Sequence, residues 1–152
     1  MTKPRPQPAG ATTGATEWAE GVEVPGRDFE ALSGPWTITI PAPCQLINLN
    51  SRMHWAPKAE MTRAWRTAAH VAASKAKLPK GLDRVHIVAH VIKPTSRAYD
   101  VHNLMPTLKA AIDGLVDFGL ISDDTNAHLT GPDLRQGGKG ELGVIITITE
   151  EV

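Results

Sequence analysis

The residues best suited to chemistry lie in one short acidic segment, between positions 100 and 124. Five of the chain's sixteen acidic residues fall there, all of them Asp: Asp100, Asp113, Asp117, Asp123 and Asp124. Lys109 is the only Lys or Arg among them. Short carboxylate side chains gathered in this way repel one another unless a cation lies between them. The segment therefore predicts a divalent-metal site, and phosphate chemistry is the natural use of such a site.

The spacing within this segment leaves two interpretations open. His102, Pro106, Lys109 and Asp113 are separated by four, three and four residues, which places them on one helix face. Asp100 would join that face from the preceding loop, and a fold-back could add Asp123 and Asp124. In the alternative, Lys109 and Asp113 form an ordinary surface ion pair, and Asp123 and Asp124 are turn residues. For Asp113, the ion pair is the favoured interpretation.

These residues need a framework, and hydrophobic periodicity indicates one. Alternating β-rich runs predict strands, and apolar residues at three- and four-residue spacings predict helices. We expect strands at residues 36–40, 84–93, 127–134 and 142–149, and helices at 58–77 and from an N-cap at Asn103 to Phe118. Residues 136–140 should form a glycine-rich turn. This order predicts an α+β fold, a small mixed β-sheet with two main helices packed on one side.

The two helices have predicted core faces. In the first, the apolar stripe comprises Met61, Ala64, Trp65, Ala68, Val71, Ala72 and Ala76. In the second, it comprises Leu104, Leu108, Ala111, Ile112 and Leu115. Trp55 and Trp65 are both expected in the core rather than as platforms for stacking nucleic-acid bases.

Length and composition restrict the class of protein. The chain has 152 residues, enough for one domain, and residues 1–34 are rich in Pro, Gly, Ala and Thr, which predicts a disordered tail before a domain at 35–152. No apolar run reaches the roughly 18 residues of a membrane span, and no secretory signal is evident. Cys44 is the only cysteine, which excludes an internal disulfide and an all-cysteine zinc site. We expect a cytoplasmic protein with no membrane partner.

The formal net charge is zero, but the charges are unevenly distributed. Residues 52–97 contain ten Lys or Arg against two acidic residues, whereas residues 100–124 carry a net charge of −4. A basic half beside an acidic pocket suits an enzyme that grips a polyanion and holds metal at the point of cleavage. A solvated helix face explains the basic half equally well.

Three strings of this segment resemble the signature of a known family. They are Asp100-x-x-Asn103-Leu104, then Lys109-Ala110-Ala111-x-Asp113-Gly114-Leu115, and finally Gly119-x-x-x-Asp123-Asp124. Together with a first strand ending in Pro-x-Pro and a loop containing Asn48 and Asn50, they resemble the RusA family of Holliday-junction resolvases. These are small, dimeric, magnesium-dependent endonucleases common in bacteriophages and prophages. The resemblance covers about residues 36–150.

The resemblance implies specific roles. Asp100 and Asp124 match the family's catalytic carboxylates, and Lys109 matches its motif lysine. Asp100, His102, Asp123 and Asp124 would bind the Mg²⁺. His102 stands where the family has a second Asp, which favours Mn²⁺ relative to Mg²⁺. Residues 105–107 are an insertion before Lys109.

The expected function is therefore that of a homodimeric crossover-junction endodeoxyribonuclease, which resolves four-way DNA junctions by paired symmetric nicks in recombination and repair. The residues expected to contact DNA are Asn50, Arg52, His54, Lys58, Arg63, Arg66 and Arg97. Two alternatives stay open. One is a branched-DNA-binding protein whose metal site has decayed through the change at His102. The other is an unrelated α+β protein-interaction domain in which the Asp residues are only caps and turns.

Overall fold

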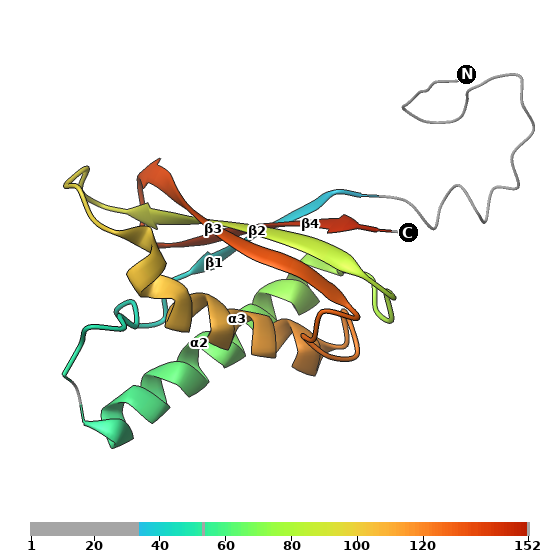
Figure 1. The fold of residues 1–152 in the computed structure, drawn as a ribbon, viewed down its shortest axis with the longest axis horizontal. Helices are drawn as coiled ribbons and strands as arrows, with labels where there is room; N and C mark the ends of the chain where they lie inside the picture. The colour runs from blue at the N-terminus through green and yellow to red at the C-terminus, as the bar shows by residue number, and fades with distance from the viewer. Residues whose placement is uncertain (1–33, 53, 152) are drawn as a thin grey trace, which may run out of the picture. The chain divides into compact units, whose positions relative to one another are not determined.

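The structure is a computed structural model, and it describes residues 34–52 and 54–151 (Figure 1). The elements in chain order are β1 (Trp36–Pro41), α2 (Trp55–Ala76), β2 (Val85–Lys93), the 3₁₀ turn η1 (Val101–Leu104), α3 (Met105–Phe118), β3 (Leu129–Lys139) and β4 (Gly143–Glu150). The predicted disordered tail falls on residues outside this range, apart from Gly34.

The four strands form one mixed sheet in the order β1-β4-β2-β3. β4 is antiparallel to both β1 and β2, whereas β3 is parallel to β2. Helices α2 and α3 both lie on one face of the sheet (Figure 1). The predicted α+β class, with a mixed sheet and two helices on one side, is confirmed.

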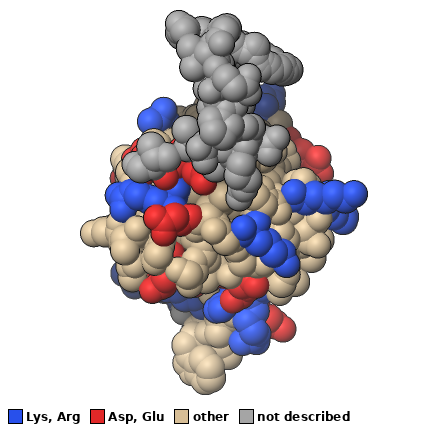
Figure 2. Space-filling view, turned by 90° about the vertical axis from the view of Figure 1, so that its right-hand side faces the viewer, with Lys and Arg blue, Asp and Glu red and all other residues tan. Residues whose placement is uncertain are grey.

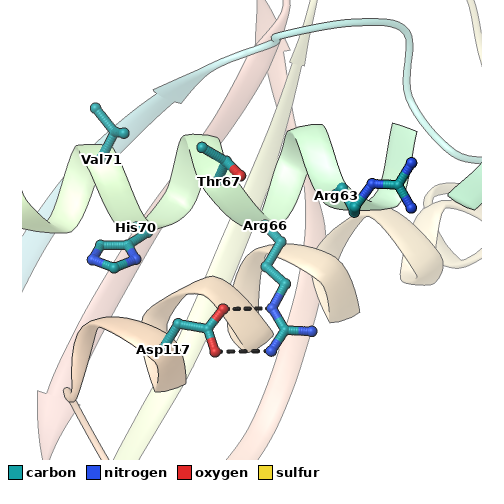
Figure 3. A pocket seen from close by; sticks show the side chains of 6 residues that line it. All are labelled: Arg63, Arg66, Thr67, His70, Val71 and Asp117. Carbon is teal, nitrogen blue, oxygen red and sulfur yellow. Dashed lines mark hydrogen bonds and ion pairs between the residues drawn. The ribbon is translucent and has the colours of Figure 1, made fainter. Parts of the chain in front are cut away.

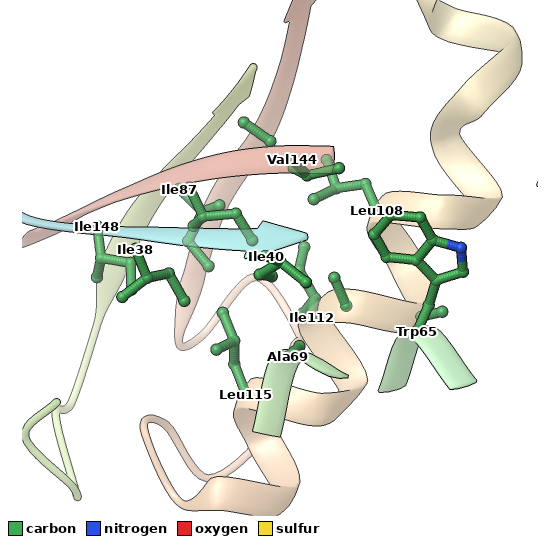
Figure 4. Packing of buried hydrophobic residues seen from close by; sticks show 14 of the residues in the cluster. Ile38, Ile40, Trp65, Ala69, Ile87, Leu108, Ile112, Leu115, Val144 and Ile148 are labelled. Carbon is green, nitrogen blue, oxygen red and sulfur yellow. The ribbon is translucent and has the colours of Figure 1, made fainter. Parts of the chain in front are cut away.

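The core lies between the sheet and the two helices (Figure 4). In β2 the side chains of Val85, Ile87, Ala89 and Val91 are buried and alternate with half-exposed neighbours, as predicted. β4 behaves in the same way, because its even-numbered residues 144–148 face the helices. The predicted core face of the second helix is also correct, since all five of its residues are buried.

The buried face of helix α2 is narrower than the predicted apolar stripe. It begins at Trp55, three residues before the expected start, and its buried residues are Trp65, Ala69 and Ala73. Val71 is 46% exposed and Ala76 is also exposed, so their places in the predicted stripe were wrong. The cause is a close crossing of the helices: a Cβ added at Gly114 of α3 would lie 2.1 Å from the Arg66 carbonyl oxygen. Small residues must line such a crossing.

Trp55 also departs from the prediction. Its side chain is 82% exposed, whereas Trp65 is fully buried. Trp55 is the first residue of α2, ahead of the part of the helix that packs on α3, so it has no core to enter. None of the helices in the described ranges is long and apolar enough to cross a membrane.

The start of α3 and the course of β3 differ from expectation as well. Asn103 is not the N-cap: Asp100 caps η1 with its side chain, and Leu104 precedes α3 without a side-chain cap. Pro106 lies in the first turn and Gly119 ends the helix with φ +104°, as predicted. The expected strand and glycine-rich turn between 127 and 140 are instead one strand, Leu129–Lys139. Pairing with β2, with two register shifts, carries the strand through these glycines.

Candidate functional site

Lys109 lies between two carboxylates. Its Nζ donates to Asp113 Oδ1 at 2.8 Å and to Asp124 Oδ2 at 2.5 Å. Asp113 is one helical turn further along α3, so the favoured ion-pair interpretation is confirmed. Asp124 comes from the loop after α3, and the predicted fold-back does bring it to this helix. The cation that these two carboxylates need is supplied, at least in part, by the lysine ammonium.

The contact between Lys109 and Asp124 stabilises the charged form of both side chains. Hydrogen bonds to Asp113 and Asp124 raise the pKa of Lys109 above its ordinary value. The hydrogen bond from Lys109 is the main reason that the pKa of Asp124 is lowered. Both groups are therefore charged at neutral pH. A carboxylate that stays ionised is what a metal ligand requires.

The loop carrying Asp124 is held by its own contacts. The backbone N–H of Asp124 donates to Asp123 Oδ1 at 2.8 Å, which uses one oxygen of that carboxylate as a turn acceptor. His128 closes the loop: its Nδ1 lies 2.7 Å from the backbone oxygen of Asp83, and its Nε2 lies 3.1 Å from Ser122 Oγ. Because a carbonyl only accepts, Nδ1 carries the proton, and a neutral ring accepts from Ser122 at Nε2. His128 thus positions the turn that presents Asp124.

Asp100 and His102 form a second group at the other end of the segment. Asp100 Oδ1 accepts from the backbone N–H of His102 at 3.0 Å and lies 3.4 Å from His102 Nδ1. The two side chains are 62% and 78% exposed. Both can therefore be reached by a ligand from solvent. The hydrogen bonds and ion pairs of the described residues do not join this pair to Lys109 or Asp124.

The donor types fit a hard divalent cation, because carboxylate oxygens are the preferred ligands of Mg²⁺ and an imidazole is tolerated by Mn²⁺. The positions of these side chains, however, do not form a complete metal site. Across residues 34–52 and 54–151, no three His, Cys, Asp or Glu side chains come together as a metal-binding group. The structure thus brings Asp124 to Lys109 and Asp100 to His102, as two separate pairs.

The loop before α2 is fastened to the start of this segment. Thr107 is buried in α3; its Oγ1 accepts from the backbone N–H of Ile47 at 2.7 Å and donates to the Ile47 carbonyl at 2.9 Å. Leu49 N–H donates to the Asn103 carbonyl at 2.8 Å. Thr107 belongs to the insertion 105–107 and was not among the predicted site residues, although it lies three residues after Leu104 on the predicted core face. Its hydroxyl fixes the loop to α3 at Ile47, and the Leu49 bond fixes it to η1.

The residues expected to contact DNA are distributed over this loop, α2 and the loop after β2. Side chains of all seven are exposed: Asn50, Arg52, His54, Lys58, Arg63, Arg66 and Arg97. Arg66 is the one with an acidic partner, because its Nε and Nη2 donate to Asp117 at 2.5 and 2.8 Å. On the side of the molecule shown in Figure 2, charges of both signs are interspersed rather than separated.

Arg63 and Arg66 also line a cavity of about 480 Å³ between α2 and α3 (Figure 3). Thr67, His70, Val71 and Asp117 complete its lining. The Arg66–Asp117 pair crosses it, so half of the cavity's basic charge is already neutralised within the chain.

Comparison with known proteins adds no assignment: neither the models of known protein families nor the curated proteins give a match to this chain.

Proposed function

We propose that this protein is a divalent-metal-dependent endonuclease of branched DNA, acting on four-way junctions. The observation that supports the proposal best is the contact between Lys109 and Asp124, two motif residues fifteen positions apart in sequence that meet at 2.5 Å. Asp100, the third motif residue, is exposed at the start of the same helical segment. A turn formed by chance would not need to fold back along α3 and end on this lysine.

In this proposal the chain's own residues have distinct tasks. Asp100 and Asp124, with His102 or Asp123, would hold the cation, which when bound activates water and offsets the charge of the scissile phosphate. Asp124 stays ionised because Lys109 stabilises its carboxylate. The Lys109 ammonium, 59% exposed, can turn towards a phosphate and stabilise negative charge there.

Binding and assembly follow from the same proposal. Exposed Arg52, Lys58, Arg63 and Arg97 would contact the phosphate backbone, so affinity should fall steeply with salt, by roughly 0.9 log units per log unit of salt for each phosphate contacted. Two paired nicks need two active sites, so the protein would act as a homodimer. The proposed place of action is the cytoplasm of a bacterium or of a phage-infected host.

The test uses the full chain, a labelled mobile four-way junction and a linear duplex of the same sequence, in Mg²⁺ or Mn²⁺. We expect nicking of the junction that is lost in Asp124→Asn. Asp117→Asn is the matched control: it lies in the same acidic segment but pairs with Arg66 of α2, and should leave nicking intact. Junction binding without nicking in any variant would favour a non-cleaving branched-DNA-binding protein. Neither binding nor nicking would favour an unrelated interaction domain.

A further inference from the structure

Trp55 is the most exposed large apolar side chain of the described residues, at 82%. It is the first residue of α2 and follows His54, which gives the helix no side-chain cap. Hydrogen bonds within the described residues leave its indole N–H unused, whereas the indole of Trp65 donates to the Gln45 carbonyl at 3.1 Å. Most of a large aromatic side chain is therefore exposed to solvent at the start of a long helix.

The surroundings of Trp55 are positive. No acidic residue occurs between positions 34 and 59. Arg52, His54 and Lys58 are exposed and take part in none of the ion pairs of the described residues. The first turn of α2 contains no acidic side chain, so the partial positive charge of the helix N-terminus adds to theirs.

The exposed Trp55 ring and the positive charges around it together favour one kind of binding partner over others. A second copy of the chain, meeting in an isologous contact, would bring the same positive charges together. A polyanion would instead be attracted by these positive charges. A single-stranded nucleic acid is a polyanion that also carries flat bases, which stack on aromatic rings. A continuous duplex offers the charge but keeps its bases stacked inside, so it uses the positive surroundings and not the ring.

We infer that Trp55 is a stacking platform for an unpaired nucleobase, held there by phosphate contacts to Arg52 and Lys58. The inference rests on the proposed function, because it names the form of DNA that the enzyme recognises: a strand with unpaired bases, as at a branch point. The loop from Ile47 to Asn50, fastened to Thr107 and Asn103, links this platform to the segment that carries Asp100.

The experiment measures binding of dye-labelled oligothymidine to the full chain by fluorescence anisotropy, in EDTA so that cleavage plays no part. Trp55→Ala should weaken binding by roughly 5- to 100-fold, the effect of losing one base stack. Trp55→Phe should retain most of the affinity, and Val71→Ala, an exposed apolar residue elsewhere on α2, should retain all of it. Binding of a blunt duplex should change little in each variant. Equal melting temperatures would show that the variants are as stable as the wild-type chain, as expected for a residue that is 82% exposed.

Unchanged affinity in Trp55→Ala would overturn the inference, as would an equal loss for duplex and single strand. A change in oligomeric state by light scattering, with oligothymidine binding unaffected, would also overturn it in favour of a protein contact. The outcome is separate from that of the nuclease. Trp55-dependent binding without junction cleavage would remove only the catalytic proposal, and cleavage with Trp55-independent binding would remove only the platform.

Discussion

Replacing Gly114 by Ala tests the close packing of α3 against α2. Helix propensity alone favours Ala over Gly by about 1 kcal/mol. The structure indicates the opposite sign, because the new Cβ would lie 2.1 Å from the Arg66 carbonyl oxygen and 2.9 Å from Ala69 Cβ. Ordinary contact begins at 3.4 Å, so the new Cβ and the carbonyl oxygen would have to move apart by about 1.3 Å. Overpacking of this kind costs about 1–3 kcal/mol, and the upper end applies here because the obstacle is backbone. After the gain of about 1 kcal/mol from helix propensity, we expect a net loss of about 2 kcal/mol.

The wild-type chain and Gly114→Ala are unfolded in urea, and their free energies of unfolding are compared. Equal m-values would show that the comparison is valid. Ser74→Ala is the control, because Ser74 is an exposed position of α2 where substitutions change stability by no more than about 0.5 kcal/mol. A Gly114→Ala protein as stable as wild type, or more stable, would show that α2 and α3 do not cross this closely. The positions of Arg66 and Asp117 across that crossing would then have to be revised.

Three further predictions concern the site. Thr107→Val keeps the shape but leaves the Ile47 N–H and C=O buried without a partner, so unfolding experiments should show a loss of about 1–3 kcal/mol. Lys109→Met should cost no more than about 1 kcal/mol at pH 7. Because the folded pKa of Asp124 is lowered, that difference should be lost as the pH falls below about 3.9. Because the folded pKa of Lys109 is raised, the difference should also be complete below about pH 10.5 and decline as the pH rises above it; a pH-independent difference would contradict this. Nicking should be faster in Mn²⁺ than in equimolar Mg²⁺, and equal rates with a harmless His102→Ala would remove His102 from the site.

Much of the fold follows from periodicity in the sequence. Alternation in residues 85–91 and 144–148 identified the two central strands and their buried faces, because these residues pack against helices on one side only. Two features could not be read in this way. β3 passes through Gly137 and Gly138, which are typical of a turn. The strand continues there through a register shift in its pairing with β2, at which Gly138 adopts φ +105°. Val71 has the right spacing for a core stripe, but the contact at Gly114 rotates α2 towards Ala69 and Ala73.

The site was predicted in part for similar reasons. The sequence left the fold-back of Asp124 open as one of two interpretations, whereas helical spacing favoured the ion pair of Lys109 with Asp113. The exposure of Trp55 was not expected, because an apolar side chain at a helix start gives no sign of whether the helix has yet reached its partner. Nor could spacing show that Lys109 binds both carboxylates at once, since that depends on the path of the loop closed by His128.

The central claim is that Asp100 and Asp124, which lie in separate pairs here, serve one cleavage site. The most direct measurement compares single-turnover junction nicking by Asp100→Asn, Asp124→Asn and the double variant. Groups that act as a unit are strongly non-additive, so each single variant should lose about 100-fold or more and the double variant should lose little further. Single variants that nick at the wild-type rate, or losses that multiply in the double variant, would contradict the claim.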